Sequence, residues 1–514
     1  MKKNVSPKLT AVSIIIFSII IHASVLSASS PTRILVTPFK NSGAAEYSWI
    51  SSGITDTVIA DLGKLKSISV ISNNDRKNAM NEIALGQTGL LDEKSIIKTA
   101  LITGADTAIT GSYSVSGKKL KIKARLINAK TGKDIKSADL NGTMDEIFNL
   151  QDRIVASLLS EKKAADNKKY KPSLKAYELY CRGQELQESD PHQALSLFKE
   201  AIKEDGSYAD AYMAAGFTSG NILSDYNESL NYMNSAVSIL EKRNESDTQQ
   251  YAKILGTMGV IKENMGYSDQ ALSYYTRAMA VLEKLDMKNS DPYASILLNT
   301  AGIYWNRRDA ASVISYTDRA RAIFNSLSLQ NTTKYAVLEM NTGLLYSLTG
   351  NSSRALEYYN KSRGIYDRLG MQNTSGYASL MNKTGSLYDD MKKPDTALEY
   401  YFKAKSILES SSMQNTEEYA DLMNKIGIAN RHTGKKEESL RYYNISKSVY
   451  EKNGLIRLVG YADILYNIAI YYAETGNKPL AGQYFRKAHE CYVTAGYTGE
   501  LRELSRQHAE SFGY

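Results

Sequence analysis

The sequence contains few of the residues that interrupt helices or cross-link chains. It has 8 prolines and 2 cysteines in 514 residues. Scarce proline favours many long helices, because a proline removes a backbone donor and disrupts a helix interior. We expect Cys181 and Cys491 to be small packing residues of separate helices. A disulfide between them is the alternative in an exported protein.

Motifs for catalysis or metal binding are missing too. The 5 histidines form no His-Glu-x-x-His pair, and the sequence lacks Cys-x-x-Cys, a phosphate-binding glycine loop and a Gly-x-Ser-x-Gly turn. The run SIIK at Ser95–Lys98 and the KTG triplets at Lys130 and Lys383 mimic penicillin-binding motifs. These triplets fall in a predicted turn and a predicted repeat helix. We therefore expect no enzyme activity, no metal site and no cofactor.

The net charge of +8 is unevenly distributed. The excess of lysine and arginine lies in the first 165 residues, whereas acidic and basic residues balance in the rest of the chain. Nucleic-acid binding depends on cations that neutralise phosphates. The neutral C-terminal region therefore argues against a nucleic-acid partner.

The first thirty residues have the pattern of a targeting segment. Three lysines among the first eight residues precede the apolar stretch 11–21, and the sequence LSA at 26–28 is typical of a cleavage site. We expect a signal peptide over residues 1–28 and a location in the periplasm or cell envelope. An uncleaved membrane anchor is the alternative, although the apolar stretch is shorter than the ~20 residues that span a bilayer.

Residues 31–163 are predicted to form an α/β domain. Apolar runs at 33–39 and 67–72 indicate buried strands, and Ser48 is a candidate cap for the helix between them. A further helix is expected over about 92–103.

Three more strands and a closing helix complete this domain. The segments DTAITGSYSVSG, KKLKIKARLINAKTG and KDIKSADLNG predict a meander with tight turns at Gly117 and Gly132. The closing helix follows Thr143, and Glu146 completes a capping box three residues later.

In their order and joining phrases, residues 33–160 resemble the TolB amino-terminal-like domain. The phrases are ILVTPF, GITDTVIADL, ISVIS, GADTAITGSYS, LKIKARLINAKTGKDI and DEIFNLQDRIVASL. This domain is related to the CsgG and FlgO families. The resemblance implies an envelope-associated, non-catalytic α/β domain that is often placed before tetratricopeptide repeats.

One predicted strand carries basic residues on a single side. Lys119, Lys121, Lys123 and Arg125 alternate with apolar residues, so their side chains share one face. This face is either a solvated surface that also discourages edge pairing or a contact with an anionic envelope surface. The sequence leaves both interpretations open.

Behind a charged linker at 164–173 the chain repeats itself every 42 residues. Six Tyr-Ala pairs open the units, at Tyr251, Tyr293, Tyr335, Tyr377, Tyr419 and Tyr461. A fixed period of this length is typical of a solenoid. The tyrosine-rich positions are expected to form the core of its repeats.

Each unit predicts two antiparallel helices that cross at small residues. Eight residues after the opening tyrosine stands Gly259, Ala301, Gly343, Gly385, Gly427 or Ala469. The second helix carries small residues at Ala271, Val313, Ala355, Ala397, Ser439 and Ala481, and again seven residues later. Small side chains let the helices approach, and tyrosines fill the ridges around them. Gly266, Gly350, Gly434 and Gly476 are expected to end first helices.

This pattern resembles the tetratricopeptide repeat, in the 42-residue form of kinesin light chains. The resemblance implies eight repeats over 174–498 and a capping helix at 499–514. The predicted fold class is thus an α/β N-terminal domain followed by an all-α tetratricopeptide-repeat solenoid. It further implies a groove that holds an extended peptide.

One side of the first helices carries the residues expected to meet this partner. They are Asn299, Trp305, Asn341, Asn382, Lys383, Asn424, Lys425 and Asn467. Asparagine can donate to and accept from a peptide backbone, and lysine favours a carboxylate. Solvated helix positions without a partner are the alternative.

The sequence thus predicts an exported, non-catalytic envelope scaffold that binds a protein or peptide in its repeats. The alternative is a subunit of a secretion or outer-membrane complex whose N-terminal domain self-associates.

Signal cleavage gives the first testable prediction. Cleavage after the LSA sequence should yield an exported protein that begins near Ser29. N-terminal sequencing of that form checks this, and an intact Met1 in a membrane fraction would instead indicate an uncleaved anchor.

Overall fold

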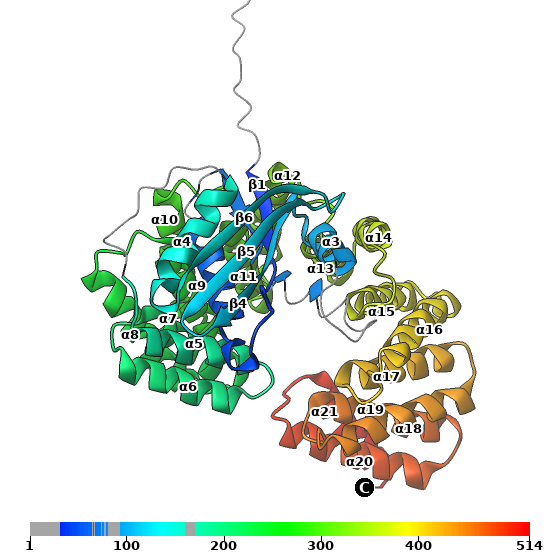
Figure 1. Cartoon of the computed structure of the whole chain (residues 1–514). Helices are drawn as coiled ribbons and strands as arrows, with labels where there is room; N and C mark the ends of the chain where they lie inside the picture. The colour runs from blue at the N-terminus through cyan, green and yellow to red at the C-terminus, as the bar shows by residue number, and fades with distance from the viewer. Residues whose placement is uncertain are drawn as a thin grey trace, which may run out of the picture.

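The structure, a computed structural model, contains an α/β domain followed by a curved array of helix pairs (Figure 1). It describes residues 31–63, 65, 67–72, 75–76, 79–80, 93–159 and 170–513. The predicted signal peptide and residues 164–169 of the predicted linker lie outside these ranges. The predicted fold class is confirmed.

The α/β domain is built on one sheet. Its strands are β1 (Thr32–Val36), β2 (Lys40–Asn41), β3 (Ile68–Val70), β4 (Thr107–Ser116), β5 (Lys119–Asn128) and β6 (Asp134–Thr143). The order is β3-β1-β4-β5-β6, with β2 beside β4. β1 runs parallel to β3 and β4, and β4 to β6 form the predicted antiparallel meander.

Helices pack on both faces of the sheet at β1, and successive side chains of this strand point to opposite faces. Ile34 and Val36 share a core with α1 (Ile50–Leu62) and α4 (Ile147–Leu159). Leu35 points the other way, into a smaller cluster with α3 (Glu93–Thr103). This explains the continuous apolar run of the strand.

The start of α4 was predicted correctly, but the start of α1 was not. The Thr143 N–H donates to Glu146 Oε2 at 2.9 Å, which forms the capping box before the short helix Met144–Glu146 and α4. Ser48 does not cap α1, because a helical turn at Ala45–Tyr47 already places Ser48 in helical geometry. The Ser48 hydroxyl donates to Glu185 instead.

The basic residues of β5 lie on an open part of the sheet. Lys119, Lys121 and Lys123 are exposed, opposite serines of β4. β5 lies between β4 and β6, so the interpretation that these lysines protect a sheet edge is wrong. Contact with an anionic surface stays a prediction.

The described part of the array consists of eight antiparallel helix pairs and a final helix. The first helices are α5 (Leu174–Leu186), α7 (Ala209–Phe217), α9 (Gln249–Asn264), α11 (Asp291–Asn306), α13 (Thr333–Leu348), α15 (Ser375–Asp390), α17 (Glu417–His432) and α19 (Val459–Glu474). The second helices are α6 (Pro191–Glu204), α8 (Tyr226–Lys242), α10 (Ser268–Lys284), α12 (Ala310–Ser326), α14 (Ser352–Leu369), α16 (Pro394–Ser410), α18 (Lys436–Lys452) and α20 (Lys478–Thr494). α21 (Glu500–Ser511) packs on α20.

Glycines lie where the helices of a pair cross, as predicted. A Cβ atom on Gly343 would lie 2.6 Å from the Tyr359 ring, and one on Gly385 would lie 2.6 Å from the Tyr401 ring. Real Cβ atoms do not approach other atoms so closely. The ring therefore occupies the space that a side chain on the first helix would need.

The repeated Tyr-Ala opening joins each unit to the one before it. The tyrosine hydroxyl bonds to the residue ten positions earlier, as Tyr419 does with Glu409 at 2.8 Å. The same bond joins Tyr251–Glu241, Tyr293–Glu283, Tyr335–Asn325, Tyr377–Asp367 and Tyr461–Glu451. A threonine or serine three residues before the tyrosine caps the helix in five of the six units. The Tyr-Ala opening recurs because each unit uses it to contact the unit before it.

The turns within the pairs need a left-handed residue after the first helix. The four predicted glycines have φ between +79° and +83°. Arg308 and Lys392 occupy the same place in two other repeats with φ near +60°. Non-glycine residues rarely adopt this conformation.

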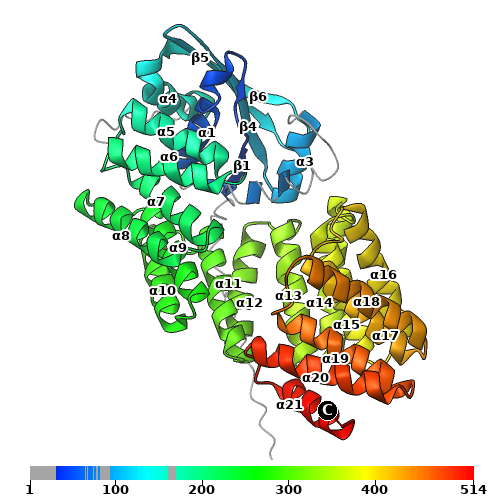
Figure 2. The ribbon, with the colours of Figure 1, turned by 90° about the horizontal axis from the view of Figure 1, so that it is seen from below.

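The α/β domain packs along one edge of the array (Figure 2). Its core continues into α5 to α7, where Gln151 donates to the Tyr177 hydroxyl at 2.8 Å. Farther along, Lys334 of α13 bonds to Asp75 at 3.0 Å and to Asp291 of α11 at 2.9 Å. Burial opposes the charge of Lys334, but Asp291 and Asp75 raise its pKa above the ordinary value.

The two cysteines do not form a disulfide. Cys181 is buried in α5 and Cys491 is partly buried in α20, and both are free thiols. The expectation of two packing residues is confirmed.

The helix crossing gives the second prediction. Gly385→Leu should lower the free energy of unfolding by ~1–3 kcal/mol, because the Tyr401 ring must move. Gly256→Leu is the matched control, since its Cβ would meet nothing within 4 Å and the next repeats carry Leu298 and Met340 there. Denaturant unfolding of the full chain compares the two, and an equal effect would refute the crossing assignment.

Candidate partner-binding face

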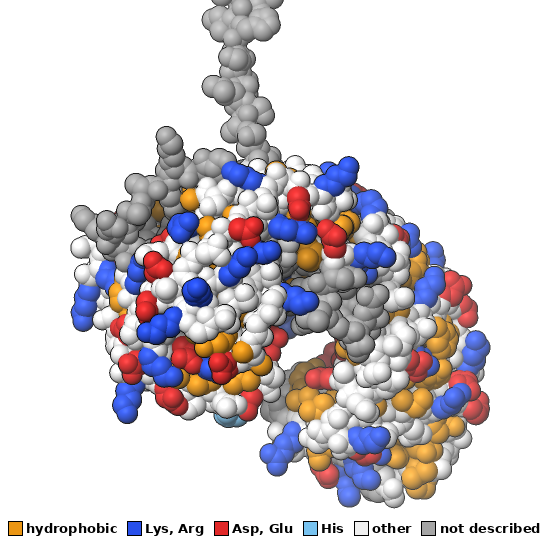
Figure 3. All heavy atoms as spheres, in the orientation of Figure 1, with side chains coloured by type: hydrophobic (Ala, Val, Ile, Leu, Met, Phe, Trp, Pro, Cys, Tyr) orange, Lys and Arg blue, Asp and Glu red, His pale blue; other side chains and the backbone are white. Residues whose placement is uncertain are grey.

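The first helices form the inner layer of the curved array. Neighbouring first helices contact one another from α13 to α19, while α14, α16 and α18 lie outside them (Figure 1). Figure 3 shows a hollow between the α/β domain and the C-terminal repeats. The face of α11 to α19 that carries the eight predicted partner residues is called the inner face below.

Three successive first helices bring five of these residues together. Lys425 of α17 donates to Asn382 Oδ1 of α15 at 3.1 Å. Asn467 of α19 donates to Asn424 Oδ1 of α17 at 3.0 Å. Each bond joins residues 43 positions apart, so the side chains form a ladder from helix to helix. Lys383 lies beside this ladder on α15.

Burial makes the two lysines of the ladder unusual. It lowers the pKa of Lys383 below the ordinary lysine value, although Glu418 opposes this. Burial also lowers the pKa of Lys425, and the charge of Lys383 lowers it further. Both ammonium groups are thus poorly solvated and gain from an added carboxylate.

Carboxylates surround the lysines. Burial raises the pKa of Glu418 and of Asp390, so these acids hold their protons more tightly than usual. Tyr450 donates to Asp421 at 2.7 Å, and Tyr492 donates to Asp463 at 2.5 Å. The inner face of α15 to α19 is therefore a mixed-charge surface with two partly desolvated cations.

Farther toward the N-terminus the predicted residues do not form a ladder. Asn299 and Asn341 are exposed, and within the described residues no hydrogen bond joins them to each other. Trp305 is half-buried near the end of α11. These three side chains line the same layer without contacting one another through hydrogen bonds.

Sequence reasoning missed the acidic part of the face. The two tyrosine–aspartate bonds span 29 residues each, from a second helix to the start of its own unit. The signal was present in the phrase YAD, which opens the units at Tyr419 and Tyr461 and also occurs at Tyr208, ahead of the six regular units.

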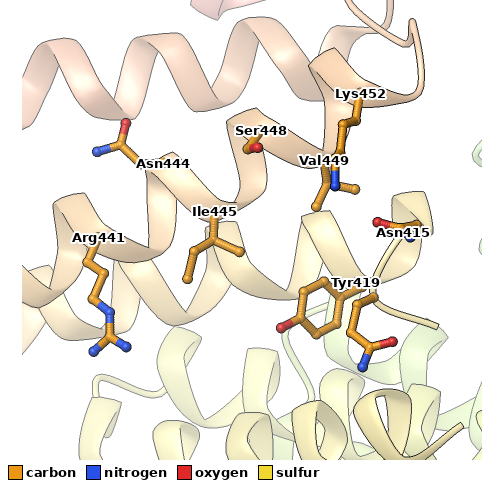
Figure 4. Close-up of a pocket in the computed structure, with 9 residues that line it drawn as sticks. Asn415, Tyr419, Arg441, Asn444, Ile445, Ser448, Val449 and Lys452 are labelled. Carbon is orange, nitrogen blue, oxygen red and sulfur yellow. The ribbon is translucent and has the colours of Figure 1, made fainter. Parts of the chain in front are cut away.

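A separate depression of about 530 Å³ lies away from the inner face (Figure 4). Its lining residues are Gln414, Asn415, Tyr419, Arg441, Asn444, Ile445, Ser448, Val449 and Lys452. Most of them belong to α18, a second helix. None of the predicted partner residues lines it.

The described ranges hold no group of three or more His, Cys, Asp or Glu side chains placed to bind a metal ion. Among the same residues, no helix combines the length and apolar character needed to cross a membrane.

No protein-family model matches the chain. "Putative adenylate cyclase 3" of Rhizobium meliloti (strain 1021) is 27% identical over 128 residues, which is 25% of this chain. The match spans only 20% of that curated protein.

Three solved structures are similar to this chain at low sequence identity. The apo form of the quorum sensor NprR from B. thuringiensis is 12% identical, with a TM-score of 0.49 over 68% of this chain and 95% of that one. A Rap protein complexed with competence and sporulation factor is 16% identical, with a TM-score of 0.40 over 60% and 94%. BtubC from P. vanneervenii is 18% identical, with a TM-score of 0.38 over 46% and 89%. These likenesses assign no activity or partner to this chain.

The lysine pair gives the third prediction. Lys383→Met removes a neighbouring positive charge, so the pKa of Lys425 should rise toward the ordinary value of about 10.4. Nuclear magnetic resonance of ¹³C-methylated lysines measures this pKa directly. Lys361→Met, at an exposed position of α14, is the control that should leave it unchanged.

The lowered pKa of Lys425 also determines the direction in which the free energy of unfolding changes with pH. Folded Lys425 binds its proton less tightly than the unfolded chain does. Its contribution to the free energy of unfolding is therefore fully present above a pH of about 10.4 and is lost as the pH falls through the folded pKa. An unchanged Lys425 pKa in Lys383→Met would show that the two lysines do not interact.

Proposed function

We propose that the protein is an exported, non-catalytic scaffold of the bacterial envelope, which binds an extended protein segment on its inner face. The ladder of Asn382, Lys425, Asn424 and Asn467 on three successive helices carries this proposal. A ladder in register offers polar groups at regular steps along a bound chain.

The side chains of the ladder suit an extended backbone. An asparagine amide both donates and accepts, and a peptide has one donor and one acceptor at most residues. The bonds between rungs hold the amides in place before a partner arrives, which reduces the entropy that binding costs.

The lysines favour a partner that carries carboxylates. Lys383 and Lys425 are half-buried and have lowered pKa values, because burial disfavours both charges and the charge of Lys383 further lowers the pKa of Lys425. A carboxylate placed between them would relieve the repulsion and form charge-assisted hydrogen bonds. An acidic side chain or a chain terminus would both supply this group.

The α/β domain is the part that we assign to the envelope. Its sequence over residues 33–160 resembles the TolB amino-terminal-like domain, and its open sheet face presents Lys119, Lys121 and Lys123. This supports a contact with an anionic envelope surface. Location in the periplasm or cell envelope rests on the N-terminal sequence pattern alone.

The test of the inner face is a selection from a displayed peptide library on the full chain, followed by affinity measurement. We expect peptides with carboxylates to be enriched. Lys383→Glu with Lys425→Glu should weaken them about tenfold or more, since each charge-assisted bond contributes ~1.5–3 kcal/mol. Replacing Asn299, Asn341 and Asn467 together with Ala should also weaken them while the helical signal stays intact.

The matched control places the same charge change on the outer helices. Lys361→Glu with Lys403→Glu alters exposed positions of α14 and α16. This control should bind the selected peptides as the unaltered chain does. Selected peptides that bind equally well to the Lys383/Lys425 variant would place the binding surface elsewhere.

A further inference from the structure

The second helices repeat two positions that are polar in most units, and two apolar residues depart from this pattern. Five and six residues after the small crossing residue of the second helix, the side chains face solvent in every repeat except at Ile445, which is half-buried. The first position holds Thr276, Asp318, Asn360, Asn444 and Arg486, but Phe402 in α16. The second holds Arg277, Arg319, Lys361, Lys403 and Lys487, but Ile445 in α18.

The two exceptions lie close together. The Phe402 ring is 42% exposed and its centroid lies 6.2 Å from that of Tyr442 in the next second helix. Ile445 follows Tyr442 by one helical turn. Tyr442, Ile445 and Val449 are spaced i, i+3 and i+7, so they lie on one side of α18.

This apolar line leads into the depression on α18. Figure 4 shows Ile445 and Val449 on the side of α18 that faces Tyr419, and all three line the depression. Apolar side chains gather over the outer surface of α16 to α20 in Figure 3. Phe402 and the half-buried Tyr442 and Ile445 thus form one apolar surface on adjoining helices, while Val449 is buried.

Positive charges stand at both ends of the depression. Arg441 lies at one end, where the two preceding repeats carry Glu357 and Glu399. Lys452 lies three turns farther along the same helix. Arg441 pairs with Glu438 at 3.3 Å, but both side chains are largely exposed, so this pair costs little to exchange.

We propose that this outer site of Phe402, Tyr442, Ile445 and the α18 depression binds an amphipathic helix of a partner protein, with acidic residues flanking its apolar stripe. The apolar line runs along one helix for two turns, which matches the stripe of a helix laid beside it. Arg441 and Lys452 would meet the flanking carboxylates. The outer site is separate from the inner face and does not depend on it.

The test uses the full chain and a labelled helical peptide with leucines at i, i+3 and i+7 between glutamates. Fluorescence anisotropy should show saturable binding, and a second peptide with lysines in place of glutamates should bind at least tenfold more weakly. Phe402→Asn with Ile445→Lys restores residues of the other repeats and should weaken binding of the acidic peptide about tenfold or more. Arg441→Glu should weaken it too, but not binding of a version with glutamines in place of glutamates.

Two controls separate this site from other effects. Arg486→Asn with Lys487→Arg alters the same two positions in α20 and should leave the affinity unchanged. Thr276→Asn with Arg277→Lys alters the same two positions in α10 and should leave the affinity unchanged as well.

Three results would overturn the proposal. They are no binding of the acidic peptide, equal binding of the lysine peptide, and full affinity in the Phe402/Ile445 variant. A second copy of the protein is the other possible occupant of the outer site, and sedimentation tests for it. If the unaltered chain self-associates and the Phe402/Ile445 variant does not, the outer site binds a second copy and the proposal is wrong.

Discussion

The array depends on one contact, an aromatic ring packed against a glycine of the neighbouring helix. Tyr359 on Gly343 and Tyr401 on Gly385 show it, and Tyr275 and Tyr443 pack in the same way on Gly259 and Gly427. Where the first helix carries Ala301, the position of the ring holds Thr317, whereas the unit with Ala469 has Phe485 there. The contact sets how closely the two helices approach and thus the thickness of each unit.

The hydrogen bond of the opening tyrosine, which connects one unit to the next, recurs as regularly as the ring–glycine contact. These two contacts leave few positions free to vary. The opening tyrosine binds a polar residue of the preceding second helix, and the alanine after it is buried in every one of these units. Repeats of this kind are stabilised by nearest neighbours, so each unit needs the same contacts. Variation is therefore confined to the inner and outer faces, where the ladder and the Phe402–Ile445 exception lie.

The features that were predicted correctly from the sequence are those decided by local residue preferences and by the repeat period. The 42-residue spacing located the crossing glycines, and the Thr143–Glu146 pair located the start of α4. Ser48 failed as a cap because the turn before it is already helical, which no single-residue preference reveals. The strand order that puts β5 inside the sheet depends on pairing across the chain, so the edge interpretation of its lysines failed as well.

Contacts between segments far apart in the chain could not be predicted from the sequence pattern. Lys334 joins α11 and α13 to Asp75 of the α/β domain, 259 residues away, and nothing in the repeat marks it. The ladder is an intermediate case. Its residue types and spacing were visible in the sequence, but the bonds between Asn382 and Lys425 and between Asn424 and Asn467 depend on how the helices are stacked.

The claim that the inner face holds a partner is tested most directly by site-specific photo-crosslinking in cells that produce the protein. A photoreactive side chain at Asn341 lies exposed on the inner layer, and one at Thr276 lies exposed on the outer helix α10. The account predicts a cross-linked partner from position 341 that is absent from position 276. A partner captured from position 276 alone, or equally from both positions, would contradict it.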